Sequence, residues 1–163
     1  MVADGLAISH ARQSDLPDIA ELLTLVNLPP DGVAEYVDGF LIARDVMGKM
    51  VGCIGMERHG KLGLLRSAAV VPGLRRHGIG SRLTAAMLER AAASGIEELV
   101  LLTATARAFF AHRFEFKDAR RADYDQRLAS SPEWRLPCCS SAVCMKLDLD
   151  SRRRSIDPSA RSS

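Results

Sequence analysis

Residues 65–83 read LRSAAVVPGLRRHGIGSRL, and this stretch decides the fold. An apolar run typical of a strand stops at Pro72, and a turn containing Gly78 and Gly80 then opens directly into an amphipathic helix. The first N–H groups of a helix have no partner inside it and lie at the positive end of its dipole, so they attract anions. Glycines let a diphosphate approach the backbone without a Cβ in the way. Further positive charge at the turn comes from Arg75, Arg76 and His77.

The sequence excludes two of the three classes of phosphate-binding loop that follow a strand in this way. A nucleotide-binding P-loop ends in Gly-Lys followed by Ser or Thr, and the chain contains no such ending. A dinucleotide-binding fingerprint needs Gly or Ala three residues after Gly80, where Leu83 stands.

The third class fits. The pattern Arg75-x-x-Gly78-x-Gly80, preceded by Val70-x-Pro72, resembles the acetyl-CoA motif of the GCN5-related N-acetyltransferases (GNAT). The resemblance implies acetyl-CoA as cosubstrate, without a metal, inserted between two central strands where they splay apart. It places Ala68, Ala69 and Val70 along the pantetheine arm, with the Val70 amide toward the thioester carbonyl. The backbone N–H groups that it assigns to the diphosphate belong to Arg76, His77, Gly78, Ile79, Gly80 and Ser81.

A second strand–helix unit, residues 103–110 (TATARAFF), is similar to the Asn-x-x-Ala-x-x-Phe-Tyr helix of the same family. Thr103 stands where the family has an asparagine that contacts the cofactor, and Phe109 matches the family's phenylalanine. Phe110 stands where a tyrosine often protonates the departing thiolate. Phenylalanine has no proton to donate, so a general acid at this position is excluded.

Four stretches are similar to the arsenic-resistance N-acetyltransferases, and more distantly to the acetyltransferase domain of N-acetylglutamate synthases. They are residues 39–44, 64–67, 101–103 with 109–110, and 138–145. The resemblance implies acetylation of the α-amino group of a glutamate-like amino acid, such as an arsenic- or phosphorus-containing glutamate analogue. Paired protomers are common in this family, which allows a homodimer.

Two charged residues bear on the acceptor side of the site. Arg66 lies in a strand that we expect to be covered on both faces, where an unpaired charge costs several kcal/mol. Glu57 lies near the end of the preceding strand, and a two-residue turn would project both side chains from one face, whereas a three-residue turn would not. Two interpretations stay open: a structural ion pair, or a site in which Arg66 binds a substrate carboxylate and Glu57 takes the ammonium proton. Asn27 is expected to border the acceptor cleft.

The alternation of the elements predicts a mixed α/β fold, with a central sheet of about 6–7 strands flanked by about four helices. A short amphipathic segment is expected near residues 33–37. Apolar periodicity and turn residues predict helices at 14–27, 79–94 and 104–113, and strands at 6–12, 40–46, 49–58, 62–71, 99–102 and 142–149.

Composition agrees with a single domain. The chain has 163 residues, of which 47% are apolar and 26% charged. The formal charge of +2 is local, because residues 151–163 carry +3 and residues 1–150 therefore carry −1. We expect one acetyltransferase domain over residues 1–150 and a disordered basic tail over 151–163. A nearly neutral body argues against nucleic-acid binding, and no secretory or membrane-spanning segment is visible, so the expected compartment is the cytoplasm.

Two other functions compete with this interpretation. The same fold could acetylate a different amine, such as a protein N-terminus, a polyamine or an antibiotic, although Arg66 disfavours a cationic acceptor. The missing tyrosine also leaves open a non-catalytic acyl-CoA-binding sensor. The four cysteines form no CxxC pair, and we expect reduced thiols, although Cys138, Cys139 and Cys144 could together bind trivalent arsenic.

Overall fold

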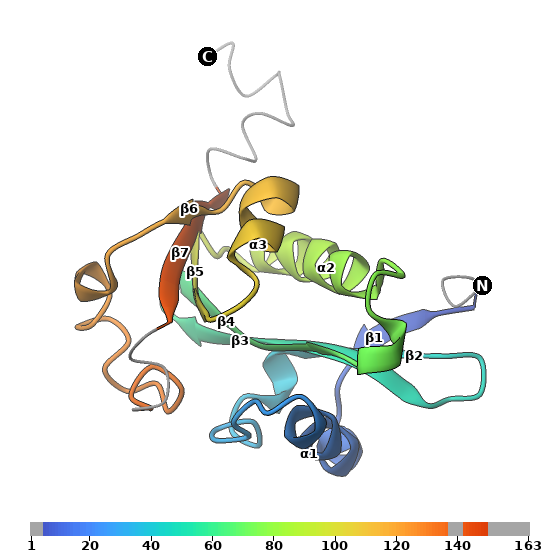
Figure 1. Cartoon of the computed structure of the whole chain (residues 1–163). Helices are drawn as coiled ribbons and strands as arrows, with labels where there is room; N and C mark the ends of the chain where they lie inside the picture. Colours follow the sequence, from blue (N-terminus) through green and yellow to red (C-terminus); the bar gives the residue numbers. More distant parts are fainter. Residues whose placement is uncertain (1–4, 137–141, 150–163) are drawn as a thin grey trace.

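The computed structural model describes residues 5–136 and 142–149, and its centre is one seven-stranded sheet (Figure 1). The strands lie in the order β1-β2-β3-β4-β5-β7-β6. Each neighbouring pair is antiparallel except β4 and β5, which are parallel. The strands are β1 (Ala7–His10), β2 (Phe40–Arg44), β3 (Met50–His59), β4 (Leu62–Val70), β5 (Glu98–Thr103), β6 (Lys117–Asp118) and β7 (Val143–Asp148). The expected mixed α/β class is confirmed.

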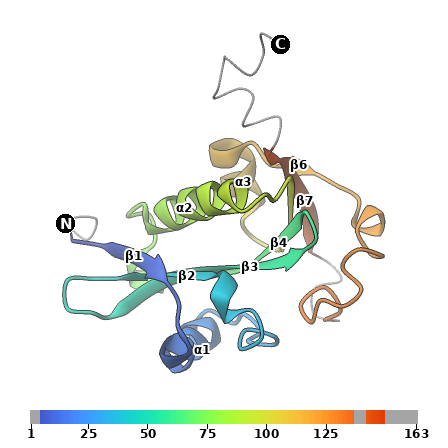
Figure 2. The same ribbon diagram turned by 180° about the vertical axis from the view of Figure 1, so that it is seen from behind.

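Helices cover both faces of the sheet. The first helix, α1 (Leu16–Leu25), lies on one face, and α2 (Ile79–Ala93) and α3 (Arg107–Phe114) lie on the other (Figures 1 and 2). Short 3-10 helices lie at η1 (Gln13–Asp15), η2 (Val37–Gly39), η3 (Pro72–Leu74) and η4 (Arg121–Asp123). In the expected amphipathic segment at 33–37, the chain forms turns over residues 31–36 that lead into η2.

The third helix begins later than the sequence predicts. We expected it from residue 104, but α3 starts at Arg107. The hydroxyl oxygen of Thr103 accepts a hydrogen bond of 2.9 Å from the amide of Ala106, so residues 104–106 form a capped turn instead of a first helical turn.

Three apolar clusters hold the layers together. The largest packs α2 and α3 on the sheet through residues such as Leu65, Met87 and Leu101. The second packs α1 on the opposite face around Ile19, Phe40 and Cys53. The third lies under the segment between β6 and β7 and contains Leu64, Val100, Tyr124, Leu128 and Trp134. This third cluster holds the described part of the connection, up to Leu136, against the sheet.

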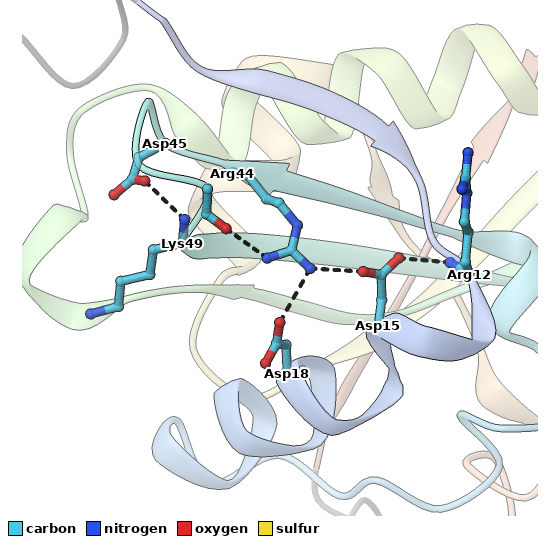
Figure 3. A network of polar contacts seen from close by, with 7 residues as sticks. Arg12, Asp15, Asp18, Arg44, Asp45 and Lys49 are labelled. Atoms are coloured by element: carbon cyan, nitrogen blue, oxygen red, sulfur yellow. Dashed lines mark hydrogen bonds and ion pairs between the residues drawn. The ribbon is translucent and has the colours of Figure 1, made fainter.

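Arg44 joins the start of α1 to the hairpin between β2 and β3 (Figure 3). Its guanidinium donates hydrogen bonds to Gly48 O at 2.8 Å, Asp15 Oδ1 at 2.7 Å and Asp18 Oδ2 at 3.2 Å. Asp15 also accepts a hydrogen bond from the amide of Arg12 at 2.8 Å. Burial alone would raise the pKa of Asp15, but the Arg12 amide and the Arg44 guanidinium together lower it below its ordinary value.

No helix within residues 5–136 and 142–149 is long and apolar enough to cross a membrane. The expected tail at 151–163 lies outside the described residues, as do Cys138 and Cys139. Cys53 and Cys144 are buried free thiols.

Candidate functional site

A pocket of about 550 Å³ opens where the two parallel central strands part. β4 and β5 pair from Leu62 with Glu98 to Leu65 with Leu101, yet the strands continue to Val70 and Thr103. The ends of both strands therefore form opposite walls of the pocket, and the beginnings of α2 and α3 contribute the rest of its lining. This is the place between two central strands where the sequence resemblance puts acetyl-CoA.

A bulge in β4 shapes one wall. Gly55 pairs with Arg66, but Cys53 pairs with Ala69, so β4 has one extra residue here. Ser67 lies at this irregularity with a left-handed φ of 57°. The Cys53 thiol donates a 3.3 Å hydrogen bond to Ser67 O, and burial raises the pKa of this thiol to about 12. Cys53 therefore stays protonated on the pocket wall, which makes it unsuited to act as an acyl-accepting thiolate.

The turn before α2 has the geometry of an anion site. Arg76 and Gly78 both have left-handed φ values, 73° and 80°, and alternate with residues of ordinary φ. Such alternation turns successive N–H groups toward one point, and the N-terminal amides of α2 extend the array. A Cβ built on Gly78 meets no protein atom within 4 Å, so this concavity is open. The first turn of α2 carries no acidic residue, and the fit to a diphosphate is good.

Most of the cofactor residues predicted from the sequence line this pocket. The lining residues among them are Ala68, Ala69, Val70, Arg75, Arg76, Gly78, Ile79, Gly80, Ser81, Thr103, Phe109 and Phe110. His77, which is exposed, is not part of the lining. Arg113 on α3 is a lining cation that the sequence reasoning missed.

Phe109 and Phe110 form the aromatic part of the wall, with ring centroids 5.1 Å apart in an edge-to-face contact. The chain has two tyrosines, and neither lines the pocket. The Tyr36 ring lies 6.1 Å from the His59 ring and is tilted by 40° to it. Tyr124 donates a 2.6 Å hydrogen bond to Glu98. Burial and this hydrogen bond raise the pKa of Tyr124. A tyrosine as proton donor to the thiolate is therefore absent from the part of the pocket that the structure describes.

Glu57 and Arg66 meet in a buried ion pair. Gly60 and Lys61 form a two-residue turn between β3 and β4. With a turn of this length, the side chains of Glu57 and Arg66 project from the same face of the sheet. Arg66 Nη1 lies 2.8 Å from Glu57 Oε2, and neither side chain is exposed. The second carboxylate oxygen of Glu57 lies 3.0 Å from His59 Nε2. Arg66 lines the pocket, whereas Glu57 does not.

The predicted acceptor residue Asn27 is also outside the lining. It is exposed, with a left-handed φ of 60°, just after α1. Its neighbours Val26 and Leu28 do line the pocket. The end of α1 therefore borders the pocket, but through apolar side chains and not through Asn27.

Glu133 is a pocket residue that the sequence reasoning missed. It lies in the connection between β6 and β7, and nothing in the local sequence indicates that this connection folds back over β4. Burial raises the pKa of Glu133 to about 7; the positive charge of Arg66 opposes this shift, and Glu57 adds to it. The pocket thus has the cations Arg75 and Arg76 at the turn before α2, and the carboxylate of Glu133 near Arg66.

Comparison with known proteins agrees with this geometry. The family model described as "Acetyltransferase (GNAT) domain" matches residues 37–118. The Amino-acid acetyltransferase of Mycobacterium tuberculosis is 31% identical over 116 residues, which cover 66% of this chain and 67% of that protein.

Solved structures show the same fold. N-acetylglutamate synthase of Neisseria gonorrhoeae, complexed with coenzyme A and N-acetyl-glutamate, has a TM-score of 0.72 and 22% identity over 88% of this chain. The chain spans 35% of that synthase. A Mycobacterium tuberculosis protein in complex with CoA and NLQ has a TM-score of 0.69 and 24% identity over 87% of this chain and 98% of its own. The matched family region includes β4, the anion-binding turn, β5 and α3, so the chain belongs to the GNAT family of acetyl-CoA-dependent N-acetyltransferases.

Proposed function

We propose that this protein transfers the acetyl group of acetyl-CoA to the α-amino group of a small glutamate-like amino acid, such as an arsenic- or phosphorus-containing glutamate analogue. The observation that carries the proposal is one continuous pocket with an anion-binding turn at one end and the buried Arg66 at the other. The named activity of the Mycobacterium tuberculosis relative, amino-acid acetylation, supports the same class of acceptor.

In this proposal acetyl-CoA lies along the end of β4. The amides of residues 76–81 bind the diphosphate, Arg75 and Arg76 add charge, and Ala68–Val70 follow the pantetheine arm with the Val70 amide toward the thioester carbonyl. Thr103, Phe109 and Phe110 form the opposite wall. Small side chains on β4 suit this role, because they leave the backbone N–H and C=O groups of the unpaired strand end accessible.

The acceptor enters beside Arg66, Val26 and Leu28. Arg66 supplies a buried positive charge that attracts an acidic acceptor and disfavours a cationic one. An α-ammonium must lose a proton before its nitrogen attacks the thioester, so the reaction needs a base. The sequence interpretation assigns this step to Glu57, directly or through water. With a protonated Cys53 on the wall, the acceptor nitrogen attacks the thioester directly in a ternary complex.

The test is mass-spectrometric detection of acetylated product from purified protein and acetyl-CoA. The acceptor panel contains glutamate, aspartate, methionine sulfoximine, phosphinothricin, arsinothricin, a polyamine and an aminoglycoside. Product from the acidic amino acids alone supports the proposal. Product from the polyamine or the aminoglycoside alone refutes the acceptor class, and CoA binding without any product favours an acyl-CoA sensor.

Arg66 provides a sharper version of this test. We expect Arg66→Met to raise the Michaelis constant for an acidic acceptor at least tenfold, while Arg66→Lys, which keeps the charge, has a smaller effect. The Michaelis constant for acetyl-CoA reports whether the rest of the pocket is intact. An unchanged acceptor constant in Arg66→Met would refute the role of this charge.

A further inference from the structure

We propose that Glu133 is the base that takes the proton from the acceptor ammonium, and that Glu57 acts as a positioning residue through Arg66. The inference rests on the proposed acetyl transfer to an amine, and it assigns the proton-transfer step to a side chain on the pocket wall.

The backbone around Glu133 is held by its neighbours. Trp134 is buried, its indole N–H donates a 2.9 Å hydrogen bond to Asp125, and its ring contacts that of Tyr124 in an edge-to-face arrangement. The Trp134 amide donates to Ser131 Oγ at 3.2 Å, and Arg121 donates to the Trp134 carbonyl. The backbone that carries the Glu133 side chain is therefore held against the sheet.

Glu133 lies where three segments meet over β4. A Cβ built on Gly32 would lie 2.8 Å from Pro132 Cγ and 3.1 Å from Arg66 Nη1. The turn after α1, the connection before β7 and the Arg66 guanidinium are therefore in contact at one point. Glu133 follows Pro132 directly and lines the pocket together with Arg66 and Val26. A carboxylate here lies near the Arg66 guanidinium, where the proposed function places the acceptor.

Glu57 is less suited to take the proton. Its two oxygens lie 2.8 Å from Arg66 and 3.0 Å from His59, and its side chain is fully buried behind the wall. Glu133, by contrast, is partly exposed on the wall, and no other described residue donates a hydrogen bond to its carboxylate. An arriving ammonium can therefore contact Glu133 without displacing an existing partner.

The charges around Glu133 suit proton transfer near neutral pH. Arg66 on β4 favours its ionised form, whereas Glu57 on β3, itself beside His59, disfavours it. Burial outweighs Arg66 and brings the pKa of Glu133 to about 7, in the range where a base is most effective in neutral solution. Glu133 would be ionised above this pH and protonated below it.

The reaction then balances in three steps. Glu133 accepts one proton from the ammonium, and the neutral amine forms a C–N bond to the thioester carbonyl carbon. The C–S bond breaks as the tetrahedral intermediate collapses, and CoA leaves as a thiolate. The second proton of the nitrogen goes to this thiolate, directly or through water, and the proton on Glu133 returns to solvent.

The experiment compares Glu133→Gln with Glu57→Gln and with Glu89→Gln, an exposed carboxylate on α2 that serves as control. Steady-state rates are measured from about pH 5.5 to 9 on the amine that the wild-type protein acetylates best. We expect Glu133→Gln to lower kcat about 100-fold or more, to leave the Michaelis constant for acetyl-CoA unchanged, and to abolish the rise of kcat/KM with pH near 7. Glu57→Gln should retain that rise, and Glu133→Asp should recover part of kcat.

The outcomes separate this inference from the function on which it rests. Product from the wild-type protein together with a wild-type rate and pH profile in Glu133→Gln would overturn the inference and leave the proposed function standing. Loss of the pH rise in Glu57→Gln but not in Glu133→Gln would overturn it in favour of Glu57. Absence of product from every amine would overturn both. Acetyl-CoA binding by Glu133→Gln verifies that the variant is folded.

Discussion

Breaking the Glu57–Arg66 pair should destabilise the protein by an amount that depends strongly on whether one partner or both are removed. At 2.8 Å and an effective dielectric constant of about 20, the attraction between the two charges is on the order of 6 kcal/mol. Transfer of both ions out of water costs several kcal/mol per ion, so the net contribution of the intact pair is small. A single substitution, however, leaves the other charge buried without a partner.

We therefore expect Glu57→Gln and Arg66→Met each to lower the free energy of unfolding by about 3–5 kcal/mol. The double variant should be no less stable than the less stable of the two single variants. In a double-mutant cycle this corresponds to a coupling energy between Glu57 and Arg66 of at least about 3 kcal/mol. Urea unfolding at low temperature, followed by tryptophan fluorescence, measures all four proteins, and Trp134 is the sole tryptophan of the chain. A loss of unfolding free energy below about 1 kcal/mol in the single variants, or strictly additive losses in the double variant, would refute an ion pair that is shielded from water.

Three further predictions follow from contacts elsewhere in the structure. Gly32→Ala should raise the Michaelis constant for the acceptor severalfold, because the new Cβ would displace Pro132. The control is Gly48→Ala, where φ is 82° and a Cβ would meet nothing within 4 Å; it should cost similar stability and leave the kinetics unchanged. Equal kinetics in both variants would contradict this prediction. Arg76→Gly should raise the Michaelis constant for acetyl-CoA without lowering the free energy of unfolding, since glycine suits its φ of 73°. The pKa of Asp15 is lowered in the folded protein, so its stabilisation should be complete above the unfolded pKa of about 3.9 and disappear as pH falls through the folded pKa. The measurement is the difference in unfolding free energy between the wild-type protein and Asp15→Asn from pH 7 to pH 3. A difference that does not change with pH would argue against this stabilisation.

The sequence alone determined the fold and the local geometry of the turn before α2. The anion-binding turn is local: one strand end, one basic glycine-containing turn and one helix start are adjacent in the chain, so their geometry follows from short-range rules. The turn between β3 and β4 is local as well. The sequence allowed two or three residues in it, and the two-residue turn that forms places Glu57 and Arg66 on one face of the sheet. The sequence did not distinguish whether those charges face a substrate or only each other.

Tertiary structure decided the part of the pocket beside Arg66. Between Arg66 and Glu133 the chain passes through α2, β5, α3 and β6. The packing of Trp134, Tyr124 and Leu128 against the sheet then brings Glu133 to the pocket. Asn27 and His77 are adjacent in sequence to residues that line the pocket, but both are exposed and neither lines it. Contacts within a few residues follow from the backbone and its turns, whereas a site assembled from distant segments depends on how the whole core packs.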